Sequence, residues 1–117
     1  MREIVFYKLP SGKSPVEEFL DSLSGKQAKK VAWVLQLIEE LPVIPSSYLK
    51  NLVNTSGILE VRVRVGHQIF RLLGFRDGKT FVVLTNGFRK KTQKTPRQEI
   101  KLAEERKKDY LNRKKKK

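Results

Sequence analysis

The chain has 117 residues, and its 26 Lys and Arg against 12 Asp and Glu give a formal net charge of +14 at pH 7. It has no Cys and a single His, which excludes disulfides, cysteine-ligated zinc and multi-histidine metal sites. The positive charge exceeds what solubility needs and favours a polyanionic partner, with nucleic acid the first candidate, an anionic membrane surface the second and an acidic protein the third.

The N-terminal third predicts a strand followed by a short helix. Residues 2–8 are rich in β-branched and aromatic side chains and predict a strand that ends at residues 10–12. Residues 14–17 combine an N-cap serine, a proline at the first helical position and a glutamate at the capping-box position. We therefore expect a short helix that ends at residues 24–25. The N-terminus lacks the apolar core of a signal peptide, so we expect a cytoplasmic protein.

A second helix is predicted from about residue 25 to residue 41, because its apolar residues recur at spacings of three and four. Trp33 lies among these positions and is expected in the core. The two helices should form a helical hairpin. Pro42 and Pro45 end the second helix, and residues 42–57 are expected to be irregular. No apolar run approaches the roughly 20 residues of a membrane span, so no membrane partner is expected.

From residue 59 the hydrophobic period changes to two, which predicts strands. Leu59, Val61, Val63 and Val65 should face one side of a sheet, and Glu60, Arg62 and Arg64 the other. Turns at residues 66–67 and 77–78 separate this strand from two more, at residues 68–75 and 80–88. These three strands should form a meander, with the N-terminal strand at an edge of the same sheet.

A final helix is predicted over residues 96–113, opened by Thr95 and Pro96. Residues 1–112 are expected to form a single domain, and residues 113–117 a basic C-terminal tail. The predicted fold class is α+β: a small, mainly antiparallel sheet with an N-terminal helical hairpin and a C-terminal helix.

Three arginines should share one face of the sheet. Arg62 and Arg64 alternate with apolar residues, and Arg71 interrupts an apolar strand, so it should point to the same side. Arginine suits phosphate because its planar group donates in pairs and stays charged. Two simpler explanations remain: a solvated outer face, and an ion pair of Arg71 with Glu60.

The segment from residue 86 to residue 96 places an aromatic and several cations before a helix N-terminus, which itself favours anions. Phe88 can stack on a nucleobase, and the cations can hold phosphates on either side of a scissile bond. Those cations are Arg89, Lys90, Lys91 and Lys94.

RNA carries its own nucleophile, the 2′-OH, so clustered cations and precise orientation can supply much of the catalysis of its cleavage. A lysine crowded by other cations has a lowered pKa and can transfer protons. No metal or other cofactor is required. The single histidine, His67, lies in a predicted turn and is more simply explained as a turn residue than as a general base.

Three stretches carry a family resemblance: residues 59–64, residues 70–73, and residues 86–103 with the string Gly-Phe-Arg-Lys-Lys-Thr-Gln-Lys-Thr-Pro. They resemble the phage-derived, HigB-type branch of the RelE/HigB toxin superfamily over nearly the whole chain. The resemblance implies a compact RelE-like α+β fold. It also implies a toxin of a type II toxin–antitoxin system that cleaves mRNA, commonly on the ribosome, and is neutralised by a HigA-like helix-turn-helix antitoxin.

By position, the resemblance implies catalytic roles for Arg62, Arg71, Lys90 and Lys91, and RNA-binding roles for Arg64, Phe88, Arg89 and Lys94. The identity of the general base stays open. The alternatives are a non-catalytic RNA- or ribosome-binding module and an interaction subunit whose basic surface docks an acidic antitoxin.

Overall fold

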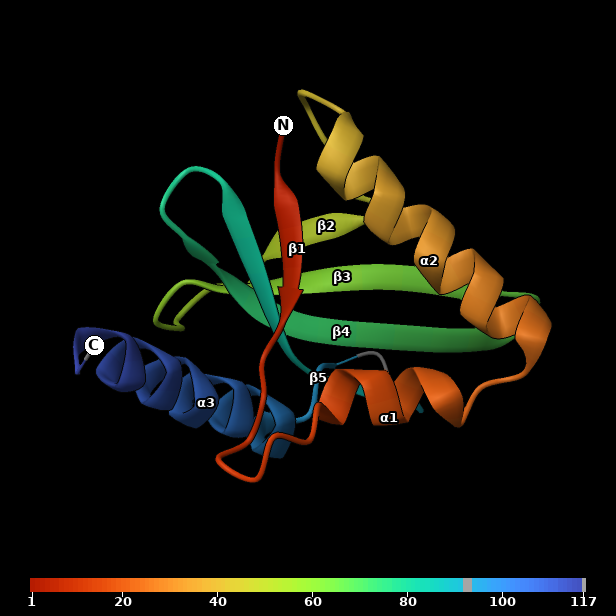
Figure 1. Cartoon of the computed structure of the whole chain (residues 1–117). Coiled ribbons are helices and arrows are strands. Elements are labelled where there is room, and N and C mark those ends of the chain that lie inside the picture. Colours follow the sequence, from red (N-terminus) through yellow and green to blue (C-terminus); the bar gives the residue numbers. More distant parts are fainter. Residues whose placement is uncertain (92–93, 117) are drawn as a thin grey trace.

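The computed structural model describes residues 1–91 and 94–116 and has the predicted α+β architecture (Figure 1). Its elements are, in chain order, β1 (Glu3–Phe6), α1 (Pro15–Asp21), α2 (Gly25–Glu40), β2 (Leu49–Asn51), β3 (Ile58–Val65), β4 (Gln68–Asp77), β5 (Phe81–Arg89) and α3 (Arg97–Lys115). The predicted order of strand, two helices, meander and C-terminal helix is confirmed. None of the described helices is both long and apolar enough to cross a membrane.

The sheet has five strands in the order β1-β5-β4-β3-β2. β3, β4 and β5 form the predicted antiparallel meander, and β1 pairs with β5 in parallel at the edge, as expected for the first strand. The prediction of an irregular segment over residues 42–57 is wrong at β2, which pairs with Leu59–Val61 of β3. A strand of three residues is too short to show a period of two, so its pattern carried no signal.

Helices cover both faces of the sheet, which explains the alternation in β3. On one face Leu59, Val61 and Val63 are buried in a core that also takes in side chains of α1 and α2. On the opposite face Ile58 and Leu73 are buried together with Ala103 of α3. Because alternate residues of a strand share a face, Glu60, Arg62 and Arg64 continue the face on which α3 packs.

The helix starts follow the capping chemistry only in part. The Ser14 hydroxyl accepts a hydrogen bond from the Glu17 amide, as predicted, and Ser24 forms a full capping box with Gln27. At the start of α3, however, the N-cap is Pro96 and no side chain caps the helix. Thr95, expected to open that helix, bonds elsewhere.

Two further expectations are corrected. Trp33 is 44% exposed rather than part of the core, because the apolar stripe of α2 is centred on Val31, Val34 and Ile38. At the C-terminus, α3 continues through Lys115 into the residues expected to form a basic tail. Arg113 pairs with Asp109 at 2.6 Å, and Lys114 pairs with Asp77 at 2.8 Å.

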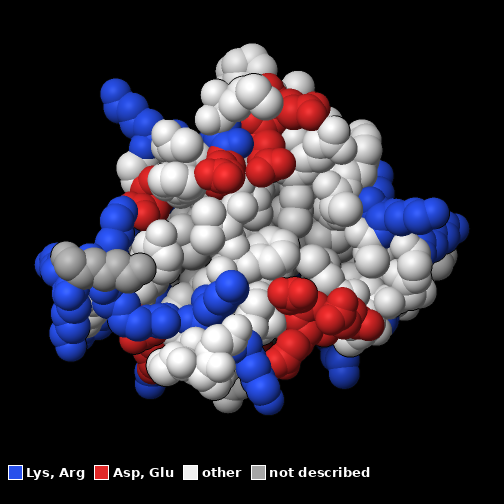
Figure 2. Space-filling view, viewed as in Figure 1, with Lys and Arg blue, Asp and Glu red and all other residues white. Residues whose placement is uncertain are grey.

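The charges are distributed unevenly over this basic chain. A groove of about 680 Å³ runs beside β1, α1 and α2, and Glu17, Glu39 and Glu40 are among its lining residues. Figure 2 shows Asp and Glu above and below a central white area without charged side chains, with most of the Lys and Arg toward the edges of this view. Three acidic side chains, Glu17, Glu39 and Glu40, therefore lie on the α1–α2 side of the sheet, on the other face from Arg62 and Arg71.

Candidate functional site

The predicted arginine face exists and is organised as a row across three strands. Arg62 of β3 is directly opposite Arg71 of β4, and Arg71 is directly opposite Phe88 of β5. Directly opposed residues of neighbouring strands point to the same face, so these side chains emerge side by side. α3 covers this face over Ile58 and Leu73 but leaves the row at its edge partly exposed.

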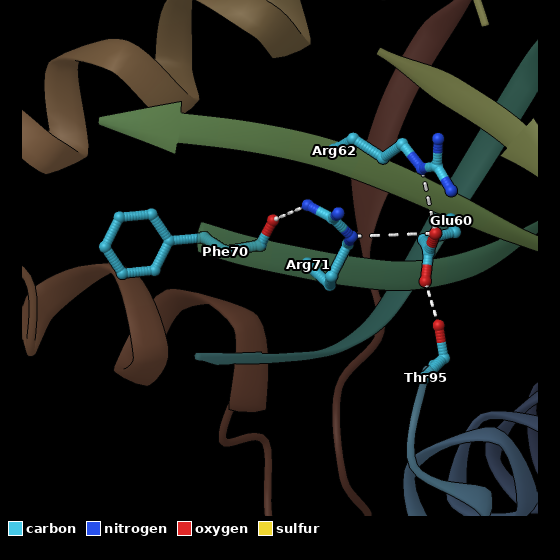
Figure 3. A network of polar contacts seen from close by, with 5 residues as sticks. All are labelled: Glu60, Arg62, Phe70, Arg71 and Thr95. Carbon is cyan, nitrogen blue, oxygen red and sulfur yellow. Dashed lines mark hydrogen bonds and ion pairs between the residues drawn. The ribbon is translucent and has the colours of Figure 1, made fainter. Parts of the chain in front are cut away.

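A buried carboxylate lies at the centre of the row. The side chain of Glu60 is 1% exposed and receives a hydrogen bond of 3.0 Å from Nε of Arg62. Nε of Arg71 lies 3.6 Å from the same oxygen, which makes an ion pair too long for a hydrogen bond. The hydroxyl of Thr95 donates to the other carboxylate oxygen. Figure 3 shows these groups converging on Glu60 from two strands and from the segment before α3.

This environment lowers the pKa of Glu60. Burial alone would raise it, but the hydrogen bonds from Thr95 and Arg62 and the charges of Arg71 and Lys90 favour the ionised form and outweigh burial. A carboxylate held this way is a weak base. Glu60 therefore orients the two guanidinium groups rather than accepting a proton from a substrate.

Arg71 keeps donor capacity that the protein does not use. One terminal nitrogen donates to the Phe70 carbonyl at 3.0 Å, while buried Nε has no hydrogen-bond partner among the described residues. Burial lowers the pKa of Arg71 and the charges of Arg62 and Arg64 act in the same direction, whereas Glu60 opposes them. Arg71 is therefore a mostly buried cation, 12% exposed and repelled by like charges, which is suited to bind an anion.

Lys90 joins the group from the end of β5. Its amide donates to the Ile69 carbonyl at 2.8 Å, which extends the pairing of β4 and β5 past Arg89. Burial lowers the pKa of the Lys90 ammonium, and Arg71, Arg62 and Lys50 lower it further, against the opposing charge of Glu60. Burial, and after it crowding by cations, thus lower the pKa of Lys90 and make it a better proton-transfer group than an ordinary lysine; crowding is the cause that the sequence predicted.

The other predicted site residues are placed less uniformly. Arg64 is exposed on the same face, one alternation beyond Arg62. Phe88 is half-buried and packs against the cluster under α3, so only part of its ring is open to a base. Lys91 and Lys94 are exposed, and Thr92 and Gln93 of the same segment lie outside the described residues.

Arg89 is on the opposite face of the sheet from Arg71. It is directly opposite Phe70, whose ring is buried with α1 and α2, and its guanidinium carbon lies 5.3 Å from that ring's centroid. Its terminal nitrogen donates to the Gln68 side chain at 3.0 Å. The structure therefore does not bring Arg89 together with the arginine row, because neighbouring residues of a strand face opposite sides.

Two residues near the row were not predicted from the sequence. Lys50 of β2 is directly opposite Glu60, which places it on the same face. Thr95 ties the segment before α3 to Glu60. No sequence signal marks Lys50, whereas the hydroxyl of Thr95 was assigned to helix capping.

The Asn-Gly pair of the motif has packing roles. A Cβ added at Gly87 would lie 2.5 Å from the Phe19 ring, so a residue without a side chain is needed for α1 to pack on β5. Asn86 is buried, and its side-chain nitrogen donates to the Glu99 carboxylate at 3.0 Å. Both residues hold helices against β5 and thereby set the position of Lys90.

Together, Arg62, Arg71 and Lys90 form a compact cationic group around one oriented carboxylate, which can bind a phosphate and move a proton. His67 is exposed in the turn between β3 and β4. Among the described residues, no three His, Asp or Glu side chains gather as a metal site would require.

Comparison with known proteins places this site inside a family. A search of curated proteins finds no match to the chain. The family model described as Phage derived protein Gp49-like (DUF891) matches residues 18–108, which includes every residue of the site from Lys50 to Thr95. The match covers most of the chain, which therefore belongs to the phage-derived Gp49-like family, a toxin-like family of RelE/HigB type.

Proposed function

We propose that this protein is an RNA-cleaving toxin of HigB type, which cuts mRNA by metal-independent transesterification. The main observation that supports the proposal is that Arg62, Arg71 and Lys90 converge around buried Glu60. The match to a toxin-like family supports the same conclusion. On this proposal, the protein stops translation by destroying the message.

The proposed reaction uses the chemistry of RNA itself. The 2′-OH loses its proton and attacks the adjacent phosphorus, a 2′,3′-cyclic phosphate forms, and the 5′-oxygen leaves with a proton. Arg71 and Arg62 donate to the phosphate oxygens and stabilise the charge that builds up on them. Lys90, with its lowered pKa, is the proposed proton-transfer group.

Binding residues surround these groups. Arg64 and Lys94 are proposed to hold neighbouring phosphates, and the open part of the Phe88 ring to stack on a base. Lys91 is exposed next to Lys90 and stays a candidate for the same reaction. Arg89, on the opposite face, is the predicted residue with the weakest support for an RNA contact.

The proposed partners are mRNA, the ribosome as its scaffold, and a HigA-like helix-turn-helix antitoxin. The acidic side chains of the groove beside β1 lie on the α1–α2 side of the sheet. They therefore do not offset the positive charge of the arginine row, which supports an RNA path across the face that carries it.

Cleavage by purified protein tests the proposal. Translating ribosomes are incubated with wild type, Arg71→Lys, Lys90→Gln and the exposed α3 control Lys108→Gln, each with and without EDTA. Arg71→Lys keeps the charge but loses the paired donors, so we expect at least a 100-fold slower cut, on the order of one lost transition-state donor. Lys90→Gln should slow the reaction similarly, and Lys108→Gln should match wild type.

The pH profile assigns the role of Lys90. The wild-type rate should rise with pH up to the lowered pKa of Lys90 and then level off, and this limb should vanish in Lys90→Gln. Cutting that EDTA abolishes would rule out the metal-independent reaction. Message that stays intact while the protein remains bound would identify a non-catalytic RNA- or ribosome-binding module instead.

A further inference from the structure

We propose that a pocket beside the arginine row is a subsite for one unstacked nucleotide of single-stranded RNA, next to the phosphate that reacts. This inference rests on the proposed function, since it assigns the neighbouring part of the same substrate. It adds residues of α2 and of the loop before β2 to the binding surface, none of which the sequence motif contains.

The pocket has a volume of about 430 Å³, within the usual range for small-ligand sites. Its lining residues are Lys30, Ser47, Tyr48, Arg62, Val63, Arg64, Ile69 and Arg71. Arg62 and Arg71 belong to both this pocket and the Glu60 group, so a strand held at the row continues directly into the pocket.

The charge in the pocket is of one sign. Its lining contains four cations, Lys30, Arg62, Arg64 and Arg71, and no carboxylate. Glu60 forms ion pairs with Arg62 and Arg71. Lys30 and Arg64 take no part in those ion pairs. Glu60 compensates part of the charge of Arg62 and Arg71, but the pocket keeps an excess of positive charge that an anion such as a phosphate of RNA would offset.

The pocket also has an aromatic and apolar wall, which a site for phosphate alone would not need. Tyr48 and Ile69 are lining residues with an aromatic and an aliphatic side chain, whereas Val63, at 2% exposed, adds little surface. The backbone carbonyl of Tyr48 accepts a 2.8 Å hydrogen bond from the Arg62 amide, so the Tyr48 backbone is held next to Arg62 of the arginine row. Cations beside an aromatic wall are the combination that single-strand binders use for a phosphate and its base.

Exposed Trp33 gains an explanation from this arrangement. Its ring meets the Tyr48 ring edge-on at 5.8 Å, and Nζ of Lys30 lies 4.4 Å from the Trp33 ring centroid. Trp33 therefore contacts two pocket-lining residues without lining the pocket itself. Its contacts favour fixed positions for the Lys30 ammonium group and the Tyr48 ring.

A strand of RNA fits this pocket better than a duplex, because a base reaches the Tyr48 ring only when it has left its stack. The test uses 2′-O-methyl RNA octamers, which lack the nucleophile and so report binding without cleavage. In one octamer series, a single abasic residue is moved along the chain. Fluorescence anisotropy gives the Kd of wild type, Lys30→Gln, Tyr48→Leu and the exposed neighbouring control Lys29→Gln.

Loss of one base stack should weaken wild-type binding about tenfold when the abasic residue is at one particular position. Tyr48→Leu should bind the intact octamer about tenfold more weakly and should no longer distinguish that abasic position. Lys30→Gln should weaken binding about threefold to fivefold, as for one partly exposed charge contact. Lys29→Gln should bind as wild type.

The inference is overturned if Lys30→Gln and Tyr48→Leu both bind as Lys29→Gln does, or if no abasic position matters. It is also overturned if inorganic phosphate competes with the octamer as well as a nucleoside monophosphate does, because the aromatic wall would then contribute nothing. These outcomes are separate from the proposed function. If wild type cuts RNA but Tyr48→Leu binds the octamer as tightly as wild type does, only the subsite proposal is wrong. If binding depends on the abasic position but wild type does not cut RNA, only the cleavage proposal is wrong.

Discussion

At the scale of single residues, Glu60 connects three groups of the site. It is a buried anion whose three partners come from β3, from β4 and from the segment before α3. Removing its charge leaves Arg62 and Arg71 facing each other across the β3–β4 pair without compensation. Breaking one partner of such a pair is costly, even where replacing the whole pair would not be.

We therefore expect Glu60→Gln to lower the free energy of unfolding by about 2 kcal/mol at pH 7, as for loss of a hydrogen bond to a charged group. Because the pKa of Glu60 is below its ordinary value of 4.5 in the folded chain, its contribution is fully present above pH 4.5 and is lost as the pH falls through the lower folded value. The difference from wild type in urea unfolding should shrink below about pH 4.5. The exposed control Glu105→Gln should show no such difference, and a loss that persists unchanged in acid would contradict the electrostatic role.

At the scale of elements, the packing of α1 on β5 determines the position of Lys90, which follows the last residue of β5. Phe19 packs over Gly87, and its ring also meets the Phe70 ring edge-on at 6.2 Å. A methyl group at position 87 would have to displace the Phe19 ring that packs there. The glycine of the motif is thus explained by helix packing rather than by an approach of RNA to the backbone.

Gly87→Ala should lower the free energy of unfolding by about 1–3 kcal/mol, the usual cost of an overpacked core. A second substitution, Phe19→Leu, should recover part of that loss in a double-mutant cycle, because it removes the ring that the new methyl group meets. Gly25→Ala is the matched control, since an added Cβ there meets no atom within 4 Å. Additive losses in the cycle would show that the two residues do not interact.

The elements that a sequence can predict are those that repeat a period. The alternation of residues 59–65 predicted the two faces of β3, and residues 77–78 predicted the hairpin turn, where Gly78 has φ +67°. The same alternation in β5 predicts that Arg89 and Phe88 point to different faces of the sheet, and we did not use this signal. The exposure of Trp33 could not be predicted, because it depends on which face of the helix packs on the sheet. The bond of the Thr95 hydroxyl to Glu60, which replaces helix capping, also depends on tertiary packing.

At the scale of the whole molecule, the net charge of +14 should make RNA binding strongly dependent on salt. For single strands, the logarithm of the binding constant falls with the logarithm of salt concentration with a slope of about −0.7 for each phosphate contacted. We expect Arg64→Ala to make that slope shallower by about 0.7 between about 50 and 200 mM salt. The exposed control Lys108→Ala should keep the wild-type slope, and equal slopes for all three proteins would place Arg64 outside the RNA path.

The parallel pairing of β1 with β5 has a consequence for the nascent chain during its synthesis. The first strand is synthesised early, but Glu3–Phe6 can pair only after Phe81–Leu84 has been synthesised. The pairing that completes this edge of the sheet is therefore a long-range contact. A nascent chain that stops before residue 81 contains Arg62 and Arg71 but neither Lys90 nor Thr95, and its first strand lacks β5, with which it pairs. On the proposed function, a partly translated copy is therefore harmless to the machinery that is making it.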